Sequence, residues 1–232
     1  MSGEPVVLIP GLASTPRYYA EQVAALWRFG ALTFANHTAH DSMAALADAV
    51  LADAPPRFAL AGHSMGGYLA FEIQRRAPSR VTRLALLDTS ARPDTAEQTA
   101  NRRRVMALAA AGQFARVNEE LMPNYLHPDR LGDAALRSLI TAMADDVGAD
   151  AFIRQENAII GRADSRPTLA AIACPTLVLV GDADRATPPD RAQEIAAGIR
   201  GATLVVVPHS GHMTSLEQPE AVTAALVDWM RR

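Results

Sequence analysis

The chain has 232 residues, which is enough for one α/β domain with a substantial buried core. Hydrophobic residues make up 49% and charged residues 20% of it, a balance that excludes an intrinsically disordered chain. The formal net charge of −3 supplies no basic field for nucleic acid or an anionic membrane, so we expect neither as a partner.

The cysteine count and the N-terminal sequence bear on the cellular compartment in which the protein resides. A single cysteine, Cys174, excludes an intramolecular disulfide and is compatible with a reducing environment. The first residues lack the basic start and apolar core of a signal peptide, and no apolar run reaches the ~20 residues that span a bilayer. We therefore expect a cytoplasmic protein. The basic run 102–104 is predicted to lie on a solvated helix face, because consecutive side chains point in different directions around a helix.

Short apolar runs alternate with helical patterns along most of the chain. This alternation predicts an α/β fold with a mainly parallel sheet of about six strands and helices on both faces. Each run is apolar throughout, as expected for strands that are buried on both faces. The predicted strands cover residues 6–9, 31–35, 58–61, 84–87, 176–180 and 203–207.

Several helices have recognisable starts. Residues 15–16 and 187–188 both read Thr-Pro, a capping residue followed by a proline suited to the first turn. Asp41 or Ser42 can cap a second helix, and Pro219 opens the last one.

One long interval, between residues 87 and 176, contains no convincing strand. A structureless loop of that length is uncommon in a compact domain. We therefore predict a helical cap at residues 92–168, inserted into an α/β core of residues 1–91 and 169–232. The helical patterns in the interval cover residues 105–111, 114–122, 134–147 and 152–160.

The sharpest chemical signal follows the predicted strand 58–61. Residues 62–67 read Gly-His-Ser-Met-Gly-Gly and lead into a helical run. A Gly-x-Ser-x-Gly turn folds a strand sharply into a helix, because a side chain at either glycine would collide with neighbouring backbone. Ser64 would then project above the carboxyl end of the strand as a nucleophile. The alternative is a tight structural turn that contains an incidental serine.

A serine hydroxyl needs a base, and the base needs an orienting carboxylate. Residues 181–184 read Gly-Asp-Ala-Asp after one predicted strand, and residues 208–213 read Pro-His-Ser-Gly-His-Met after the next. Both loops emerge at the same edge of a parallel sheet as Ser64, where ligands bind in such sheets. The candidate acids are Asp182, Asp184 and Asp88, and the candidate bases are His209 and His212.

Over its whole length the chain resembles the α/β-hydrolase superfamily. It is most similar to the small capped members, namely carboxylesterases, 3-oxoadipate enol-lactonases and cofactor-free haloperoxidases. The resemblance implies the α/β-hydrolase fold, with Asp184 as the acid of a Gly-x-x-Asp motif and His212 as the base of a Gly-His pair. The matching stretches are residues 8–12, 62–67, 179–184 and 211–213.

The tetrahedral intermediate of acyl transfer needs two preorganised donors. The N–H of Met65, directly after the nucleophile, supplies one of them. The resemblance places the second at the N–H of Leu12, in the loop after strand 6–9. Relatives commonly have His-Gly in this loop, whereas this chain has Pro10 and Gly11, so a side chain that often supports the loop is missing.

The beginning of the sheet also departs from the family. Only five residues precede strand 6–9, so the usual N-terminal β-hairpin is predicted to be missing. An uncovered apolar edge strand is a liability, so we expect a homodimer paired through strand 31–35, or a segment that covers it. By analogy the sheet order is 31–35, 6–9, 58–61, 84–87, 176–180 and 203–207.

Two His-x-x-His pairs resemble halves of a metal site. They are His37 with His40 and His209 with His212, but no cysteine or acidic partner recurs at ligand spacing. We expect no metal and no cofactor. His37, His40 and Asp41 could instead line the mouth of the pocket, or they could be ordinary polar residues of a loop.

Apolar side chains of the cap are the candidates for contact with the substrate, although each could instead pack the cap against the sheet. They are Met106, Phe114, Met122, Tyr125 and Phe152.

The predicted partner is a small ester-like molecule. Ser64, His212 and Asp184 would hydrolyse an ester, thioester or lactone by acyl transfer. Two alternatives remain open. The same triad could serve carbon–carbon hydrolysis, perhydrolysis or a lyase step, or the fold could act as a low-turnover ligand receptor.

Overall fold

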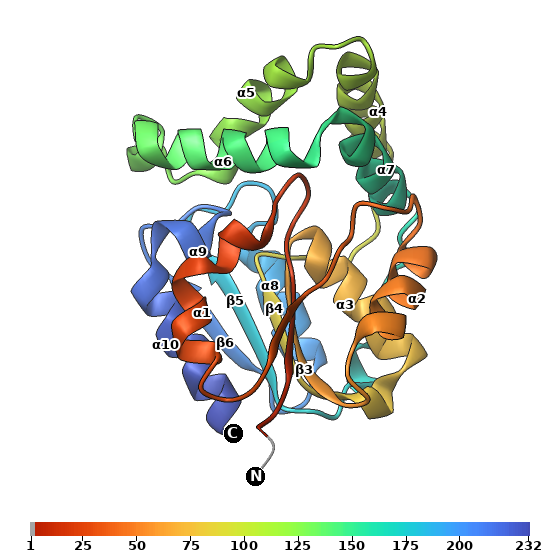
Figure 1. The fold of residues 1–232 in the computed structure, drawn as a ribbon, viewed down its shortest axis with the longest axis vertical. Coiled ribbons are helices and arrows are strands. Elements are labelled where there is room, and N and C mark those ends of the chain that lie inside the picture. The colour runs from red at the N-terminus through yellow and green to blue at the C-terminus, as the bar shows by residue number, and fades with distance from the viewer. Residues whose placement is uncertain (1–2) are drawn as a thin grey trace.

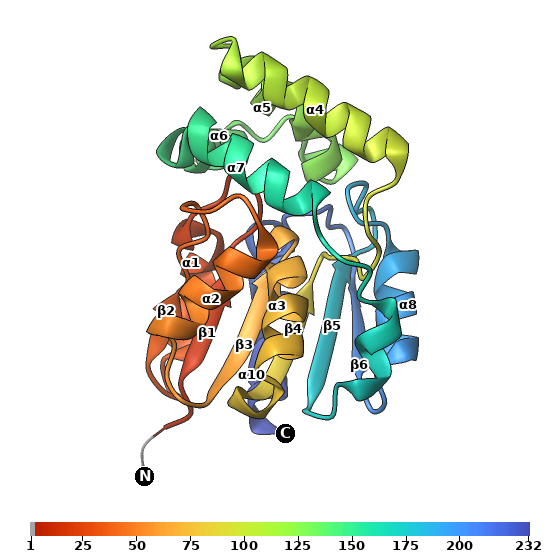
Figure 2. The ribbon, with the colours of Figure 1, turned by 90° about the vertical axis from the view of Figure 1, so that its right-hand side faces the viewer.

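Six parallel strands form the centre of the molecule, which the computed structural model describes for residues 3–232. They lie in the order β2-β1-β3-β4-β5-β6, the order expected from the sequence (Figure 1, Figure 2). The strands are β1 (Val6–Ile9), β2 (Leu32–Phe34), β3 (Phe58–His63), β4 (Val81–Leu87), β5 (Thr176–Gly181) and β6 (Thr203–Val207). The main difference from the prediction is at β4, which begins at Val81 rather than at residue 84.

Each face of the sheet is covered by its own helices. Along β1, Val7 and Ile9 pack into a core with side chains of α2, α3 and α8, while Val6 and Leu8 pack against α1 and α10 on the other face. The helices of both faces are seen in Figure 1. Strand residues of both sets are therefore apolar. These helices are α1 (Ala20–Leu26), α2 (Met43–Asp53), α3 (Met65–Arg76), α8 (Pro189–Gly198) and α10 (Pro219–Arg231), with the short α9 (Thr214–Glu217) before α10.

The helix starts confirm some of the capping signals. Ser42, rather than Asp41, caps α2, because its hydroxyl accepts a hydrogen bond from the backbone at Ala45. Thr15 caps only a short 3₁₀ turn, Pro16–Tyr19, ahead of α1. Thr187 makes no cap hydrogen bond to α8, because its side chain is turned towards the loop after β5.

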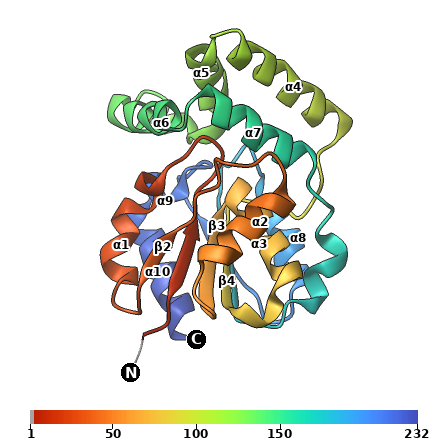
Figure 3. The ribbon, with the colours of Figure 1, turned by 45° about the vertical axis from the view of Figure 1, so that its right-hand side comes forward.

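Four helices between β4 and β5 form a layer above the carboxyl ends of the strands (Figure 1, Figure 3). The first begins well before its predicted start at residue 105, because Thr95 and Gln98 form a capping box. They are α4 (Ala96–Ala110), α5 (Phe114–Tyr125), α6 (Ala134–Val147) and α7 (Ala149–Ile160). We call this layer the cap; its boundaries at residues 92 and 168 stay a prediction.

Two strands form the edges of the sheet. In the described part of the chain β2 pairs with β1 alone, and its residues are half-buried. The other edge is β6, where Val206 is 44% exposed. Pairing of the β2 edge with a second copy stays a prediction. No helix within residues 3–232 is long and apolar enough to cross a membrane.

Candidate active site

Ser64 lies in the sharp turn between β3 and α3. Its backbone has φ +52° and ψ −114°, a conformation that a residue with a side chain rarely adopts. A Cβ on Gly62 would lie 2.2 Å from the carbonyl oxygen of Gly66, and a Cβ on Gly66 would lie 2.3 Å from that of Ile9. Both positions therefore require glycine. The Ser64 N–H donates to the carbonyl of Leu87 at 2.9 Å, which ties the turn to β4.

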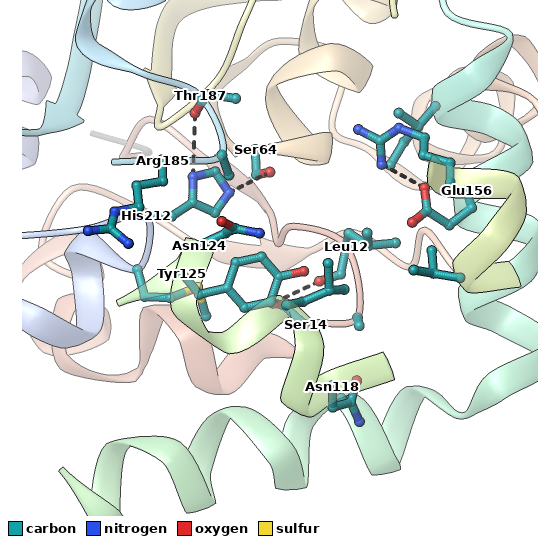
Figure 4. Close-up of a pocket in the computed structure, with 18 of the residues that line it drawn as sticks. Leu12, Ser14, Ser64, Asn118, Asn124, Tyr125, Glu156, Arg185, Thr187 and His212 are labelled. Carbon is teal, nitrogen blue, oxygen red and sulfur yellow. Dashed lines mark hydrogen bonds and ion pairs between the residues drawn. The ribbon is translucent and has the colours of Figure 1, made fainter. Parts of the chain in front are cut away.

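The turn places Ser64 beside the two residues that the family pattern selects. His212 Nε2 lies 2.8 Å from Ser64 Oγ (Figure 4). His212 Nδ1 lies 2.8 Å from Asp184 Oδ2. His212 and Asp184 are both 3% exposed, so water screens their interaction little. With its proton on Nδ1, the imidazole donates to Asp184 and can accept the Ser64 proton on Nε2.

Asp184 is held in one orientation by its own loop. Its carboxylate accepts hydrogen bonds from the N–H groups of Ala186 at 2.8 Å and Thr187 at 2.9 Å. The Thr187 hydroxyl donates to Asp184 Oδ2 at 2.8 Å. It also lies 3.4 Å from His212 Nδ1 (Figure 4). The Thr187 side chain that the sequence suggested as a helix cap therefore orients the acid.

Asp182 and His209, the alternative acid and base, lie in the loops next to the triad and make no hydrogen bond with Ser64 among the described contacts. Asp182 accepts from the N–H groups of His209 and Ser210, both at 3.1 Å, and so shapes the segment that leads to His212. The His209 side chain is exposed. In the described residues no group of three or more His, Cys, Asp or Glu side chains is arranged to hold a metal ion.

Asp88, the third candidate acid, lies beneath the triad and is fully buried. Its carboxylate accepts from the N–H of Gly181 at 3.0 Å and from the hydroxyl of Thr214. Burial, and then repulsion by Asp184, raises the pKa of Asp88 well above its ordinary value. Asp88 thus links the end of β4 to the loops that follow β5 and β6, without a hydrogen bond to the His212 ring among the described contacts.

The charge around His212 favours its protonated form. Burial by itself would lower the pKa of His212. Attraction to Asp184, assisted by Asp88 and Glu217, outweighs burial and raises the pKa of His212 above its ordinary value. The imidazolium that forms when a serine proton is transferred is therefore stabilised here.

The two positions predicted to supply oxyanion donors lie near Ser64. Met65 is the first residue of α3, where N–H groups have no acceptor within the helix. Leu12 lines the same cavity as Ser64, in the loop after β1 (Figure 4). The positions predicted for an oxyanion hole are therefore adjacent to the nucleophile.

The Leu12 loop is supported from the cap and from the loop after β2. Ala13 has a φ of +51°, and its N–H donates to Gln155 Oε1 at 3.0 Å. His37 Nε2 donates to the carbonyl of Gly11 at 2.8 Å. Gln155 is fully buried and His37 is 2% exposed, so neither lies at the pocket mouth. These contacts supply the support that the Pro-Gly sequence lacks, and no local pattern pointed to them.

A cavity of about 260 Å³ lies between Ser64 and the cap. Of the five apolar cap residues proposed for substrate contact, only Tyr125 lines it. The Tyr125 ring stacks on the imidazole of His212, with ring centroids 5.8 Å apart (Figure 4).

The other four residues proposed to contact the substrate lie outside the cavity lining. Phe114 and Phe152 pack against each other inside the cap, with ring centroids 5.1 Å apart. Met122 is buried in the core on one face of the sheet, and Met106 is half-buried on α4 outside the cavity lining. The packing of the helices therefore leaves these side chains outside the cavity that contains Ser64.

The prediction of a solvated basic face at residues 102–104 is wrong for Arg102. Its Nε donates to Asp94 at 2.8 Å and its Nη1 to Glu156 at 2.6 Å, and it lines the cavity. Arg103 and Arg104 are exposed as expected. Arg102 differs because it lies on the side of α4 that packs against α7.

Residues 6–225 match the protein family described as the alpha/beta hydrolase family. The chain belongs to the α/β-hydrolase family. RutD of Variovorax paradoxus (strain S110), which carries the provisional name of a carbamate hydrolase, is 28% identical over 252 aligned residues, covering 99% of this chain and 92% of RutD. The structure of a thermophilic esterase from Thermogutta terrifontis matches with a TM-score of 0.90 and 30% identity, covering 99% of this chain and 90% of the esterase.

An enol-lactonase from Burkholderia xenovorans LB400 has the same fold. Its TM-score is 0.88 at 23% identity, with 100% of this chain and 93% of the lactonase covered. With relatives and structural neighbours of this kind along its whole length, this α/β-hydrolase-family protein is a hydrolase.

Proposed function

We propose that this hydrolase cleaves a small ester, thioester or lactone by acyl transfer through Ser64. The observation that carries the proposal is the pair of 2.8 Å contacts that joins Ser64, His212 and Asp184 at the floor of the cavity. The esterase and lactonase among the structural neighbours support the same class of bond.

In the proposed reaction Ser64 Oγ attacks the substrate carbonyl while His212 Nε2 takes its proton. Asp184 holds the ring and stabilises the imidazolium. The N–H groups of Leu12 and Met65 receive the charge that develops on the carbonyl oxygen. His212 then protonates the leaving alcohol, thiol or lactone oxygen, and it activates water to release the acid.

The test compares Ser64→Ala with the parent protein on p-nitrophenyl esters, thioesters and lactones. Loss of the hydroxyl should abolish fluorophosphonate labelling and leave at most a residual ~10³–10⁴-fold acceleration over water, the level left after loss of a triad residue. Ser79→Ala is the matched control, because Ser79 is exposed and distant from the elbow in the fold. The melting transition should change little in either variant.

Persistent labelling or full turnover in Ser64→Ala would exclude Ser64 as the nucleophile. A burst of one equivalent without steady-state turnover would instead favour a ligand receptor on this fold. Turnover of carbon–carbon substrates in preference to esters would assign the same triad to that reaction.

A further inference from the structure

The cap side of the cavity carries polar as well as apolar side chains, and the proposed acyl transfer uses none of these polar groups. They come from α4, α5 and α7 rather than from the sheet edge that carries Ser64 (Figure 4). The polar residues of the cap that line the cavity are Gln98, Asn101, Arg102, Asn118, Asn124 and Glu156.

Asn118 is the clearest of these groups. It lies on α5 and is only 7% exposed, and its Nδ2 is buried without a hydrogen-bond partner in the described part of the chain. A buried amide without a partner costs free energy, so native proteins rarely keep one. The Asn118 side chain lines the cavity, and its Oδ1 makes no hydrogen bond among the described contacts and is not enclosed as Nδ2 is, so the amide can accept a hydrogen bond from a bound molecule.

Arg102 and Glu156 add a donor and an acceptor to the same wall. Arg102 reaches Asp94 through Nε and Glu156 through Nη1, which leaves its third nitrogen for a ligand. Glu156 receives Arg102 on Oε2, which leaves Oε1. The Glu156 side chain is 2% exposed, so hydrogen bonds made here are little weakened by solvent.

The charges behind this wall balance. Arg102 pairs with both Asp94 and Glu156, and Arg162 pairs with Asp94, which gives two cations and two anions. A ligand with a net charge would meet no opposite net charge in this group. Arg185, another cation on the cavity lining, is exposed and lies beside His212 (Figure 4). The cap wall therefore suits a neutral group that both donates and accepts hydrogen bonds.

We infer that the substrate carries a neutral hydrogen-bonding group of the carboxamide type on the arm beneath the cap. Asn118 and the Arg102–Glu156 pair hold this group while Ser64 attacks the carbonyl at the other end. The inference rests on the proposed ester hydrolysis, whose substrate class it narrows.

The experiment uses substrates of matched shape and different polarity. Methyl 4-methylpentanoate, methyl succinamate and monomethyl succinate end in a hydrocarbon, an amide and a carboxylate of similar outline. A second set places the same groups on the alcohol, as acetates of 3-methylbutanol, 3-hydroxypropanamide and 3-hydroxypropanoate. Acid release at constant pH gives kcat/KM for each. In at least one set the amide should exceed the hydrocarbon by about 10–100-fold and should also exceed the carboxylate.

The variant Asn118→Leu keeps the shape of the side chain and removes the unpartnered amide. The amide preference should fall by about tenfold, the value of one hydrogen bond, with no loss of thermal stability. Asn157→Leu is the matched control. Asn157 is exposed on α7 and does not line the cavity, so its replacement should leave the preference unchanged.

Equal or better turnover of the hydrocarbon ester, or a preference for the carboxylate, in both sets would overturn the inference. An unchanged preference for the amide substrate in Asn118→Leu would show that Asn118 does not hold the amide group. Failure of ester hydrolysis itself would show as no turnover of any ester. In that case, calorimetric binding of the same compounds to Ser64→Ala still measures the preference of the pocket, and a preference for the amide is the expected result.

Discussion

The carboxyl edge of the sheet and the cap above it enclose one cavity, but different interactions position their side chains. At the edge, the course of the backbone positions the side chains. The turn after β3 positions Ser64, and the loops after β5 and β6 position Asp184 and His212. In the cap, side chains from separate helices hold one another, as Arg102 holds Glu156 from 54 residues away. We therefore expect the sheet edge to carry out the same reaction on different substrates, and the cap to determine which substrates bind.

The largest expected effect concerns the acid at the sheet edge. Under the proposed mechanism Asp184→Asn removes the carboxylate that orients His212 and should lower kcat by roughly 10⁴-fold, the loss known for the equivalent change in a Ser-His-Asp protease. Asp182→Asn and Asp88→Asn are the controls, and both should cost much less, because neither contacts the His212 ring. Steady-state kinetics on one ester checks the ranking. If Asp88→Asn is the most damaging, the acid follows β4 instead of β5.

A second change should affect the cap alone. Phe152 is fully buried inside the cap, so Phe152→Ala should lower the free energy of unfolding by about 3–5 kcal/mol. Denaturant unfolding measures this loss. Ratios of kcat/KM between short and long acyl esters should stay constant, because Phe152 does not line the cavity. Altered ratios at unchanged stability would show that the interior of the cap contacts the substrate after all.

A third change probes the connection between the two regions. Gln155→Leu removes the acceptor for the Ala13 N–H and loosens the loop that carries Leu12. Misplacement of an oxyanion donor should lower kcat by roughly 10²-fold with little change in KM. Affinity for a trifluoromethyl ketone analogue should fall in parallel, and Gln155→Glu, which keeps an acceptor, should recover part of both.

A purely structural role for Gln155 would give a different pattern. Stability would fall in Gln155→Leu, while kcat and the affinity for the ketone would remain at the parent level. Asn157→Leu, an exposed change on the same helix, controls for nonspecific loosening of α7.

The smallest expected effect is on the pH profile. Because Asp184 helps to raise the pKa of His212, protonated His212 persists to higher pH than an ordinary histidine would. Protonated His212 cannot accept the serine proton, so kcat/KM should rise with pH through a value above that of a free histidine. In Asp184→Asn the residual activity should have its acidic limb at lower pH, since burial then dominates. A parent limb at or below the ordinary histidine value would contradict this assignment.

The sequence alone predicted the strands, their order by family analogy, and the meeting of Ser64, Asp184 and His212. The strands, the serine turn and the polar loops depend on local signals: continuous apolar runs, a Gly-x-Ser-x-Gly turn, and polar residues directly after strands. The choice of Asp184 and His212 among the candidate acids and bases depends on the family resemblance. Parallel strands end at a common edge, so residues far apart in the chain are brought together by topology without any detailed knowledge of packing.

Only the tertiary structure decided what the cap presents to the cavity. Arg102 and Arg103 are equivalent in the sequence, yet the first lines the cavity and the second is exposed, because the packing of α4 against α7 turns them apart. Gln155 reaches Ala13 across 142 positions, and no periodicity marks such a pair. Apolar periodicity shows that a helix is buried but leaves open which neighbour it packs against, and for that reason the sequence is compatible with Phe152 either in the pocket or in the packing of the cap.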